Sequence, residues 1–230
     1  MENTYRYDLI NHLIRTRNYT TYLEVGTRDP ADNFDRVVCH SKECIDPSPL
    51  SERITYKMTS DEAFRLIHRE GKRYDIIFID GLHLKEQVDR DIENGLRALR
   101  EGGVLVLHDC NPPTIYHAHL TFDEAWDHPI TQRAWNGTVY QSIIDLRLRR
   151  DDLRVVVVDT DWGCGVVWRA SGSPTLTTPL YRDPAQPEEA IFTYRYLHRH
   201  RRELLNLISV AEFYALFSGN GVGTGTDSKT

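Results

Sequence analysis

The chain has 230 residues, the size of one α/β domain with additional segments, so a single active site is expected. Lys and Arg total 28 against 34 Asp and Glu, which gives a net charge of −6 and disfavours a nucleic-acid binder led by phosphate contacts. With 40% hydrophobic and 27% charged residues, the composition is that of a globular protein with a real core. It excludes wholesale disorder and a small disulfide-stabilised fold.

The N-terminus and the apolar runs predict a cytoplasmic protein. The first residues, MENTYRYDLINHL, lack the basic start and the apolar core of a secretory signal. Runs such as IIFI at 76–79 and VVVV at 155–158 are far shorter than the roughly 20 residues that span a bilayer, so no membrane contact is expected. The four cysteines show no CxxC pairing, which favours reduced, mostly buried thiols.

Short apolar runs alternate with helical patterns, which is typical of a mostly parallel sheet covered by helices on both faces. The predicted strands are 21–25, 43–46, 54–58, 74–80, 103–108, 153–159 and 165–169. The segment between the last two is too short for a helical crossover, so these strands should pair as an antiparallel hairpin. The pattern predicts a Rossmann-like, doubly wound α/β sheet of seven strands that ends in this hairpin.

The helical patterns complete the predicted domain, which spans residues 1–217. After the fourth strand, Val88, Ile92 and Leu96 recur at helical spacing before a Gly pair. A long helix is predicted at about 188–214, where its apolar face could pack on the sheet or form a homodimer contact. The Gly-, Thr- and Ser-rich residues 218–230 are expected to form a disordered tail.

The first strand leads into a turn with features of a nucleotide site. Gly26 permits close backbone approach, and a helix after it would direct free N–H groups at a ligand. Asp46 ends the second strand, where a carboxylate commonly binds ribose hydroxyls. Together they suggest a nucleoside-containing ligand, and a Gly turn with an Asp-Pro strand end and no ligand is the alternative.

Polar residues also follow the fourth and fifth strands, whose ends face the binding crevice of an open α/β sheet. FIDGLH places Asp80 and His83 there, and VLHDCNPP places His108, Asp109 and Asn111 beside them. Two neighbouring carboxylates repel unless a hard divalent cation holds them, so magnesium is predicted with Asp80 and Asp109 as ligands. Taken singly, Asp80 could be a turn residue, Asp109 a helix cap, and His83 a capping or core histidine.

These pieces resemble class I S-adenosylmethionine-dependent methyltransferases, in particular the small metal-dependent O-methyltransferases that include macrocin-type sugar O-methyltransferases. The matching pieces are LEVGTR, ECIDP, MTSDEAF, YDIIFIDGLH, GGVLVLHDCNP, WNGTVYQSIIDLR and TDWGCGVV. They run in family order from about residue 20 to residue 170, and the spacing from Asp80 to Asp109 also fits. The resemblance implies the class I methyltransferase fold, with S-adenosyl-L-methionine and Mg²⁺ as cofactors.

The resemblance also implies roles for individual residues. The cofactor site that it implies comprises Glu24, Gly26, Thr27, Arg28, Asp46, Ser60, Asp61 and Asp80. In it, Glu24 and Gly26 lie at the methionine end and Asp46 lies on the ribose. Ser60 and Asp61 would lie near the adenine, and His83 falls where related sugar O-methyltransferases place a general base.

One departure from the family pattern concerns the metal. Catechol-type relatives have Asp-Asn at the end of the fifth strand, whereas here Cys110 follows Asp109 and the asparagine comes one position later, at Asn111. The third protein ligand of the metal is therefore left open.

The segment 111–138 is long and rich in aromatic residues and histidine, as suits a lid over a substrate. Aromatic side chains that merely pack are the alternative. The candidate substrate residues are His108, Asn111, Tyr116, His117, His119 and Trp135.

The predicted function is magnesium-assisted methylation of a hydroxyl on a saccharide or similar small polar acceptor, in polysaccharide or natural-product biosynthesis. A cation would polarise the hydroxyl and His83 would accept its proton, which makes attack on the sulfonium methyl feasible. The alternatives are methylation of a catechol or other phenol, and an S-adenosylmethionine-binding module without turnover. A dinucleotide oxidoreductase is disfavoured because the full GxGxxG turn is missing.

Overall fold

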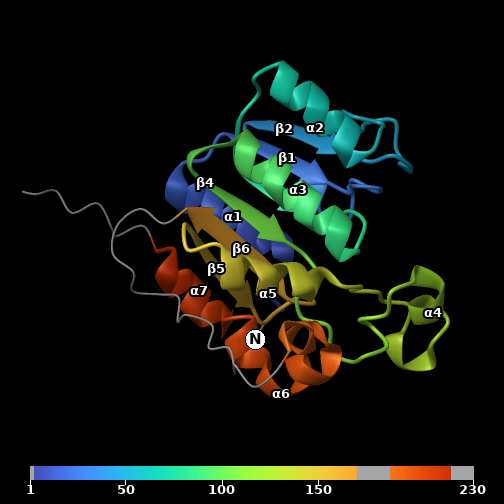
Figure 1. Ribbon diagram of the computed structural model, residues 1–230. Helices are drawn as coiled ribbons and strands as arrows, with labels where there is room; N and C mark the ends of the chain where they lie inside the picture. The colour runs from blue at the N-terminus through green and yellow to red at the C-terminus, as the bar shows by residue number, and fades with distance from the viewer. Residues whose placement is uncertain (1–2, 170–186, 219–230) are drawn as a thin grey trace, which may run out of the picture.

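The computed structural model describes residues 3–169 and 187–218, and a mixed sheet forms its centre (Figure 1). The strands are β1 (Thr21–Val25), β2 (Ser41–Ile45), β3 (Tyr74–Ile79), β4 (Leu99–Leu107), β5 (Leu153–Val158), β6 (Cys164–Arg169) and β7 (Leu207–Ile208). Their order across the sheet is β2-β1-β3-β4-β6-β5-β7. The strands β1 to β4 are parallel, and β6 is antiparallel to both β4 and β5. The predicted Rossmann-like sheet with its antiparallel hairpin is confirmed.

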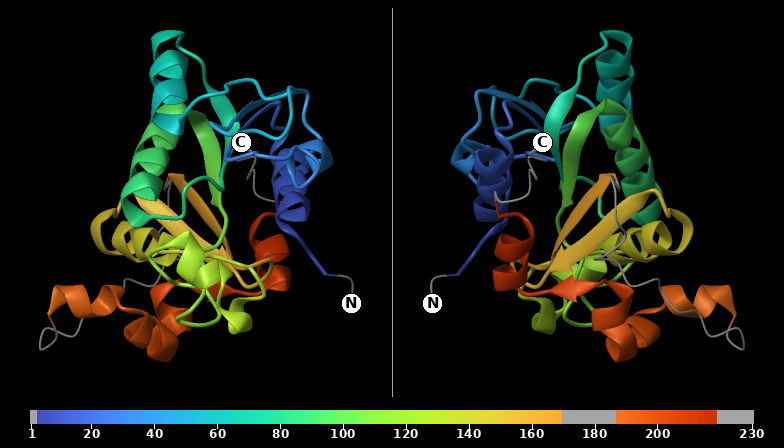
Figure 2. Two further views of the ribbon diagram at one scale, coloured as in Figure 1. Left: turned by 90° about the vertical axis from the view of Figure 1, so that its right-hand side faces the viewer. Right: turned by 90° about the vertical axis from the view of Figure 1, so that its left-hand side faces the viewer.

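Helices cover both faces of this sheet (Figure 2). The helices are α1 (Arg6–Arg17), α2 (Ser60–Arg69), α3 (Lys85–Ala98), α4 (Phe122–Trp126), α5 (Val139–Arg149), α6 (Tyr194–Leu204) and α7 (Val210–Leu216). One core contains the inner sides of α2, α3 and α5, and the other contains those of α1 and α7. Along β3, Ile77 and Ile79 belong to the first core, whereas Ile76 and Phe78 belong to the second. This alternation follows from the two-residue period of a strand that is buried on both faces.

The chain leaves β1 toward β2 on one side and returns to β3 on the other, so the strand order reverses between β1 and β3. Ligands of open α/β sheets bind outside the carboxyl ends of the strands at this point. Gly26 follows β1 with a φ of 86°, and a Cβ there would lie 2.0 Å from the carbonyl oxygen of Asp80. Glycine is therefore required so that the two strand ends can touch, and not only for the approach of a ligand.

Two expected elements at this end of the sheet are absent. Residues 54–58 form no strand, because only Tyr56 bridges to Ile45 before Thr59 caps the start of α2. The seventh strand is instead β7, which pairs parallel with β5 at the opposite edge. The expected helix after Gly26 is replaced by turns and the short 3₁₀ segment η1 (Phe34–Arg36), so no helix N-terminus faces the ligand side there.

The predicted long helix over 188–214 is wrong. This segment contains the 3₁₀ segment η3 (Glu188–Phe192), then α6, β7 and α7. Asn206 adopts a left-handed φ of 48°, and Ser209 caps a new helix with Glu212, so the chain turns twice where one helix was expected. The predicted tail beyond residue 218 lies outside the described residues.

Residues 111–138 contain α4 and the 3₁₀ turn η2 (Pro129–Thr131) and project beyond the edge of the sheet (Figure 1). Their lid function stays a prediction. The four cysteines are free thiols, and all but the half-buried Cys39 are buried, as predicted. Across the described part of the chain, every helix is too short or too polar to span a membrane.

Candidate active site

A cavity of about 560 Å³ opens at the carboxyl ends of β1, β2 and β3. Its polar lining residues are Arg28, Asp46, Thr59, Ser60, Asp80, His83 and Gln87. Phe122 and Trp135, from the segment 111–138, line the same cavity. The cavity has the size of a small-molecule site, and it lies where the strand order reverses.

Five of the eight predicted cofactor residues line this cavity. They are Gly26, Arg28, Asp46, Ser60 and Asp80. The other three do not line it: Glu24 and Thr27 are buried, and Asp61 accepts a hydrogen bond from Gln87. The contribution of these three to a cofactor site stays a prediction.

The Asp46 carboxylate is oriented by two backbone groups. Arg28 N–H donates to Oδ2 at 2.9 Å, and Ser48 N–H donates to Oδ1 at 2.7 Å. Each oxygen keeps a second lone pair, so the carboxylate can still accept hydroxyl groups from the cavity.

Glu24 is a buried carboxyl group in a small polar cluster. It accepts hydrogen bonds from the Tyr22 hydroxyl and from Asn33 Nδ2, the latter at 2.7 Å. Burial outweighs these contacts and raises the pKa of Glu24 to about 7. The group therefore changes charge near neutral pH.

Asp80, His83 and Asp109 converge at one end of the cavity. Each offers one ligand atom, and these atoms lie within 4.8 Å of one another. His83 Nε2 lies 3.2 Å from Asp80 Oδ1 and 3.5 Å from Asp109 Oδ2. Asp109 has a left-handed φ of 59°, an uncommon conformation for a residue other than glycine. The two carboxylates are hard oxygen ligands that fit a divalent cation, and the imidazole of His83 lies beside them.

The charges of this cluster shift its pKa values. Burial alone would raise the pKa of Asp80, but His108 and His83 outweigh it and hold that pKa well below its usual range. Burial alone would lower the pKa of His83, but its hydrogen bond with Asp80 and the charge of Asp109 raise that pKa to about 9. In the absence of a cation, the histidines thus supply the positive charge that the carboxylates need.

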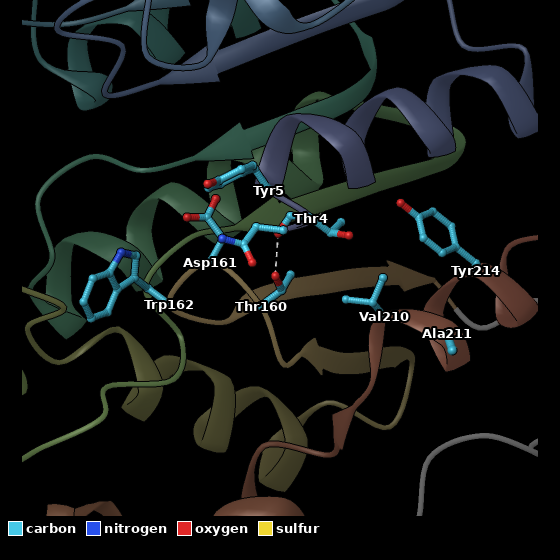
Figure 3. Close-up of a pocket in the computed structure, with 9 residues that line it drawn as sticks. Thr4, Tyr5, Thr160, Asp161, Trp162, Val210, Ala211 and Tyr214 are labelled. Carbon is cyan, nitrogen blue, oxygen red and sulfur yellow. Dashed lines mark hydrogen bonds between the residues drawn. The ribbon is translucent and has the colours of Figure 1, made fainter. Parts of the chain in front are cut away.

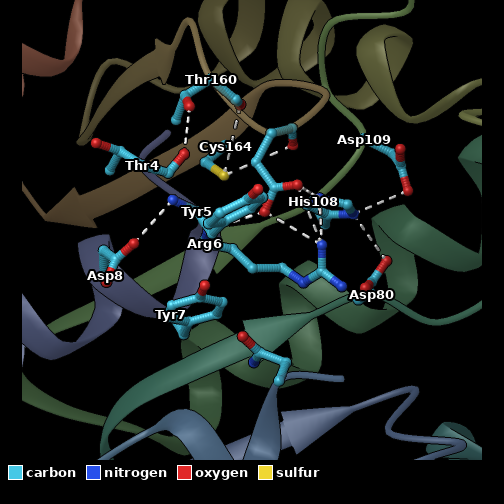
Figure 4. A network of polar contacts seen from close by, with 12 residues as sticks. Thr4, Tyr5, Arg6, Tyr7, Asp8, Asp80, His108, Asp109, Thr160 and Cys164 are labelled. Atoms are coloured by element: carbon cyan, nitrogen blue, oxygen red, sulfur yellow. Dashed lines mark hydrogen bonds and ion pairs between the residues drawn. The ribbon is translucent and has the colours of Figure 1, made fainter. Parts of the chain in front are cut away.

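A second layer lies behind the carboxylates (Figure 4). His108 Nδ1 is 3.0 Å from Asp109 and 3.4 Å from Asp80, and its Nε2 faces Arg6 at 3.2 Å. Arg6 also pairs with Asp161 at 3.1 Å, and Asp161 accepts the Arg6 backbone N–H at 2.8 Å. The start of α1 is thereby fixed to the β5–β6 turn next to the site.

A second cavity, of about 710 Å³, adjoins this layer through Asp161 (Figure 3). The N-terminal residues Asn3 to Tyr5, the turn Thr160 to Trp162, and α7 line it. Asp161 and Trp162 both have left-handed φ angles, a costly conformation for a residue as bulky as Trp162. Sequence patterns gave no signal for this cavity, because it forms from three distant segments.

The six predicted substrate residues are not brought together. Trp135 lines the first cavity, and the buried His108 contacts Asp80 and Asp109. The other four line neither of the two cavities: Asn111 contacts Asp159 and Arg201, Tyr116 the ring of His128, His117 the hydroxyl of Thr114, and His119 the carboxylate of Glu124. The pattern of the segment 111–138 could not show which side chains face inward, and it missed Phe122. Gln87, on α3, was also missed.

Comparisons with known proteins match part of the sequence and the fold. Residues 16–110, which contain β1 to β4 and Asp109, match the family model Methyltransf_24, described as a methyltransferase domain. No curated protein sequence matches the chain. The chain is similar in structure to the methyltransferase PaMTH1 of Podospora anserina, solved with S-adenosylhomocysteine, with 13% identity and a TM-score of 0.53. That match covers 74% of this chain and 80% of the other.

Two further similar structures are methyltransferases of biosynthetic pathways. TomG from Streptomyces achromogenes, involved in tomaymycin synthesis, shares 16% identity over 72% of this chain and 80% of its own, with a TM-score of 0.49. MycE of the mycinamycin pathway, solved with Mg, S-adenosylhomocysteine and mycinamycin VI, shares 17% identity over 71% of this chain and 50% of its own, with a TM-score of 0.44. The strand order and the likeness to PaMTH1 show that the chain has the class I methyltransferase fold. Residues 16–110 are similar to a methyltransferase domain.

Proposed function

We propose that this protein is an S-adenosylmethionine-dependent, magnesium-assisted O-methyltransferase that acts on a hydroxyl of a saccharide or similar small polar molecule. The observation that carries the proposal is the cavity lined by Asp46 and Ser60 as well as by Asp80 and His83. Asp46 and Ser60 supply hydrogen-bond acceptors for a nucleoside, and Asp80 and His83 supply groups for cation binding and proton transfer. The methyltransferase domain match over residues 16–110 supports this assignment.

The residues on the cofactor side of the cavity bind the cofactor and take no part in proton transfer. Asp46 accepts the ribose hydroxyls, because Arg28 and Ser48 N–H groups fix its carboxylate. Ser60 and Gln87, which hydrogen bond to each other at 3.0 Å, lie near the adenine. When bound, S-adenosylmethionine supplies the methyl group, and Mg²⁺ polarises the acceptor hydroxyl.

His83 is the proposed general base. Its Nδ1 lies 2.7 Å from the carbonyl oxygen of Trp135, so Nδ1 carries the hydrogen and Nε2 faces Asp80 and Asp109. In the neutral ring, Nε2 can accept the proton of a hydroxyl that lies beside the carboxylates. A cation on those carboxylates opposes their effect on the pKa of His83 and favours this neutral form.

The proposed acceptor lies against Trp135 and Phe122. The two rings meet edge to face, with centroids 5.8 Å apart, and both line the cavity that contains His83. Aromatic faces beside carboxylates and imidazole suit a ring that is apolar on its face and polar at its edge. The proposal includes a role in polysaccharide or natural-product biosynthesis, in the cytoplasm.

The first experiment is calorimetric titration of the full chain with S-adenosylhomocysteine, with and without MgCl₂. The wild type should bind at micromolar concentration, and Asp46→Ala should weaken this binding at least tenfold. Asp109→Asn should keep cofactor binding and lose Mg²⁺ binding, and Asp123→Asn, which changes an exposed carboxylate, should match the wild type. A wild type that does not bind S-adenosylhomocysteine would overturn the proposal.

A second experiment separates the saccharide from the phenol alternative. Methyl transfer to a panel of methyl glycosides and catechols should favour the glycosides, and His83→Ala should lower their turnover by about 10² to 10⁴-fold. A phenol needs less help from a base, so activity on catechols that survives the substitution would support the alternative instead.

A further inference from the structure

We propose that Asn136 supplies a third protein oxygen, its amide Oδ1, to the divalent cation held by Asp80 and Asp109. This inference rests on the proposed function, since it concerns the same cation. It assigns the ligand to the segment Trp135–Asn136–Gly137–Thr138, whose Asn136 lies 27 residues after Asp109, rather than to the residues that directly follow that strand end.

The Asn136 side chain is fully buried beside the carboxylate cluster. Its Nδ2 donates a hydrogen bond to Asp109 Oδ1 at 2.7 Å, while its Oδ1 has no hydrogen-bond partner among the described residues. Both atoms belong to one planar amide group, so the free oxygen lies close to the Asp109 carboxylate. A buried amide oxygen without a partner is unfavourable, and a hard cation is a ligand that can satisfy it.

The backbone holds Asn136 in place on both sides. Asn136 N–H and Gly137 N–H both donate to the carbonyl oxygen of His117, at 2.9 and 3.0 Å. Thr138 N–H donates to the carbonyl oxygen of His83 at 2.8 Å, and the Trp135 carbonyl oxygen accepts from the His83 ring. The segment is thus attached to the same histidine that faces the two carboxylates, which is how outer contacts of a metal site set the position of its ligands.

Asn111 has no free amide atom for this role. Its Nδ2 donates to Asp159 Oδ1 at 3.0 Å, and its Oδ1 accepts a hydrogen bond from Arg201. Asn111 therefore joins β4 to the hairpin and to α6. The contrast between a fully paired Asn111 and a half-paired Asn136 makes the two residues a matched pair for an experiment.

The test is calorimetric titration with MnCl₂, and then MgCl₂, in the absence of cofactor and acceptor. Asn136→Ala should weaken cation binding at least tenfold, whereas Asn111→Ala should leave it within twofold of the wild type. Equal affinity in wild type and Asn136→Ala would overturn the inference. Circular dichroism without metal checks that each variant is folded.

Asn136→Asp distinguishes a ligand from a group that merely positions Asp109. This variant keeps an oxygen and loses the N–H donor, so a ligand role predicts cation binding at least as tight as in the wild type. Binding that is tenfold weaker would show that only the hydrogen bond to Asp109 matters, and would overturn the inference. If Asn136→Ala does not fold, a crystal structure of the wild type with Mg²⁺ decides, through an Oδ1–metal distance near about 2.1 Å or beyond about 3.5 Å.

Failure of the inference is distinct from failure of the proposed function. Titration with S-adenosylhomocysteine should be unchanged in Asn136→Ala, because Asn136 is not among the residues that line the cofactor cavity. A wild type that binds S-adenosylhomocysteine but no cation would overturn the inference and the magnesium step, and would leave the cofactor assignment intact.

Discussion

Gly137 shows how a single backbone position supports the site. Its φ is 57°, and a Cβ there would lie 2.0 Å from the carbonyl oxygen of His83. The left-handed conformation and the close contact both require glycine. The residue therefore lets the segment that carries Asn136 lie directly against His83.

Replacing this glycine should destabilise the protein. We expect Gly137→Ala to lower the free energy of unfolding by about 3 kcal/mol, measured by urea denaturation. The added methyl group would clash with the backbone of His83, and alanine is also strained at a positive φ. Gly71→Ala is the matched control, since Gly71 has a φ of 68° with nothing within 4 Å, and should cost about 1 kcal/mol. Equal losses in the two variants would mean that the contact with His83 contributes nothing.

Glu24 gives stability a pH dependence of known sign. Its pKa is about 7 in the folded protein and close to the ordinary value of 4.5 in the unfolded chain. Between these two pH values the folded protein binds more protons than the unfolded chain. The free energy of unfolding therefore falls as the pH rises from about 4.5 to 7, and it stays lower above pH 7.

Glu24→Gln should remove this loss. Relative to the wild type, the variant should gain up to about 3 kcal/mol in unfolding free energy between pH 5 and pH 8. Urea denaturation at several pH values measures it, with Glu86→Gln, at an exposed position, as control. A difference between Glu24→Gln and wild type that does not change with pH would contradict the assigned pKa.

At the scale of elements, the chain after residue 187 shows why boundaries were harder to predict than strands. The apolar residues Leu197 and Leu204 are buried at helical spacing, as expected. Ser209 and Glu212 form a capping box, a signal that can be read from sequence and that starts α7. A continuous apolar pattern hid this signal, because β7 contributes apolar residues between the two helices.

Ser209 should therefore be needed for α7. Its hydroxyl accepts the Glu212 N–H at 3.2 Å, and α7 places Phe213 in the core against α1. Ser209→Ala should lower the free energy of unfolding by about 1 kcal/mol, and Ser209→Asp, which can still cap the helix, should lose much less. Urea denaturation compares them, and equal losses would show that capping is not the cause.

The sheet was largely predictable because its strands are buried on both faces and read as continuous apolar runs. The apolar run at 54–58 was wrongly predicted to be a strand. Its apolar residues pack next to β2, but its backbone makes only one bridge. The carboxylates Asp80 and Asp109 were found because strand ends are easy to place. Asn136 was missed because a loop pattern does not reveal which side chain turns toward a distant strand end. Gln87 was missed because it lies on α3, beyond the strand ends that the sequence pattern singled out.

At the scale of the whole molecule, the carboxylate cluster couples cation binding to stability. A cation that binds only the folded chain should stabilise it by about 2.7 kcal/mol at 100 times its dissociation constant. For a chain of this size, MgCl₂ should then raise the Tm of the wild type by about 5–10 °C in a calorimetric scan. Asp109→Asn should show no such rise, and a rise of the same size in that variant would place the cation elsewhere.

The site draws on the whole length of the described chain. Arg6 pairs with Asp161, which lies 155 residues later, and Thr160 contacts the backbone of Thr4. During synthesis, the N-terminal residues Thr4 and Arg6 therefore leave the ribosome long before Thr160 and Asp161, which they contact, have been added to the chain. Contacts of such long separation form late in folding, so a chain stopped before the β5–β6 turn would contain the matched methyltransferase segment and still lack a finished site.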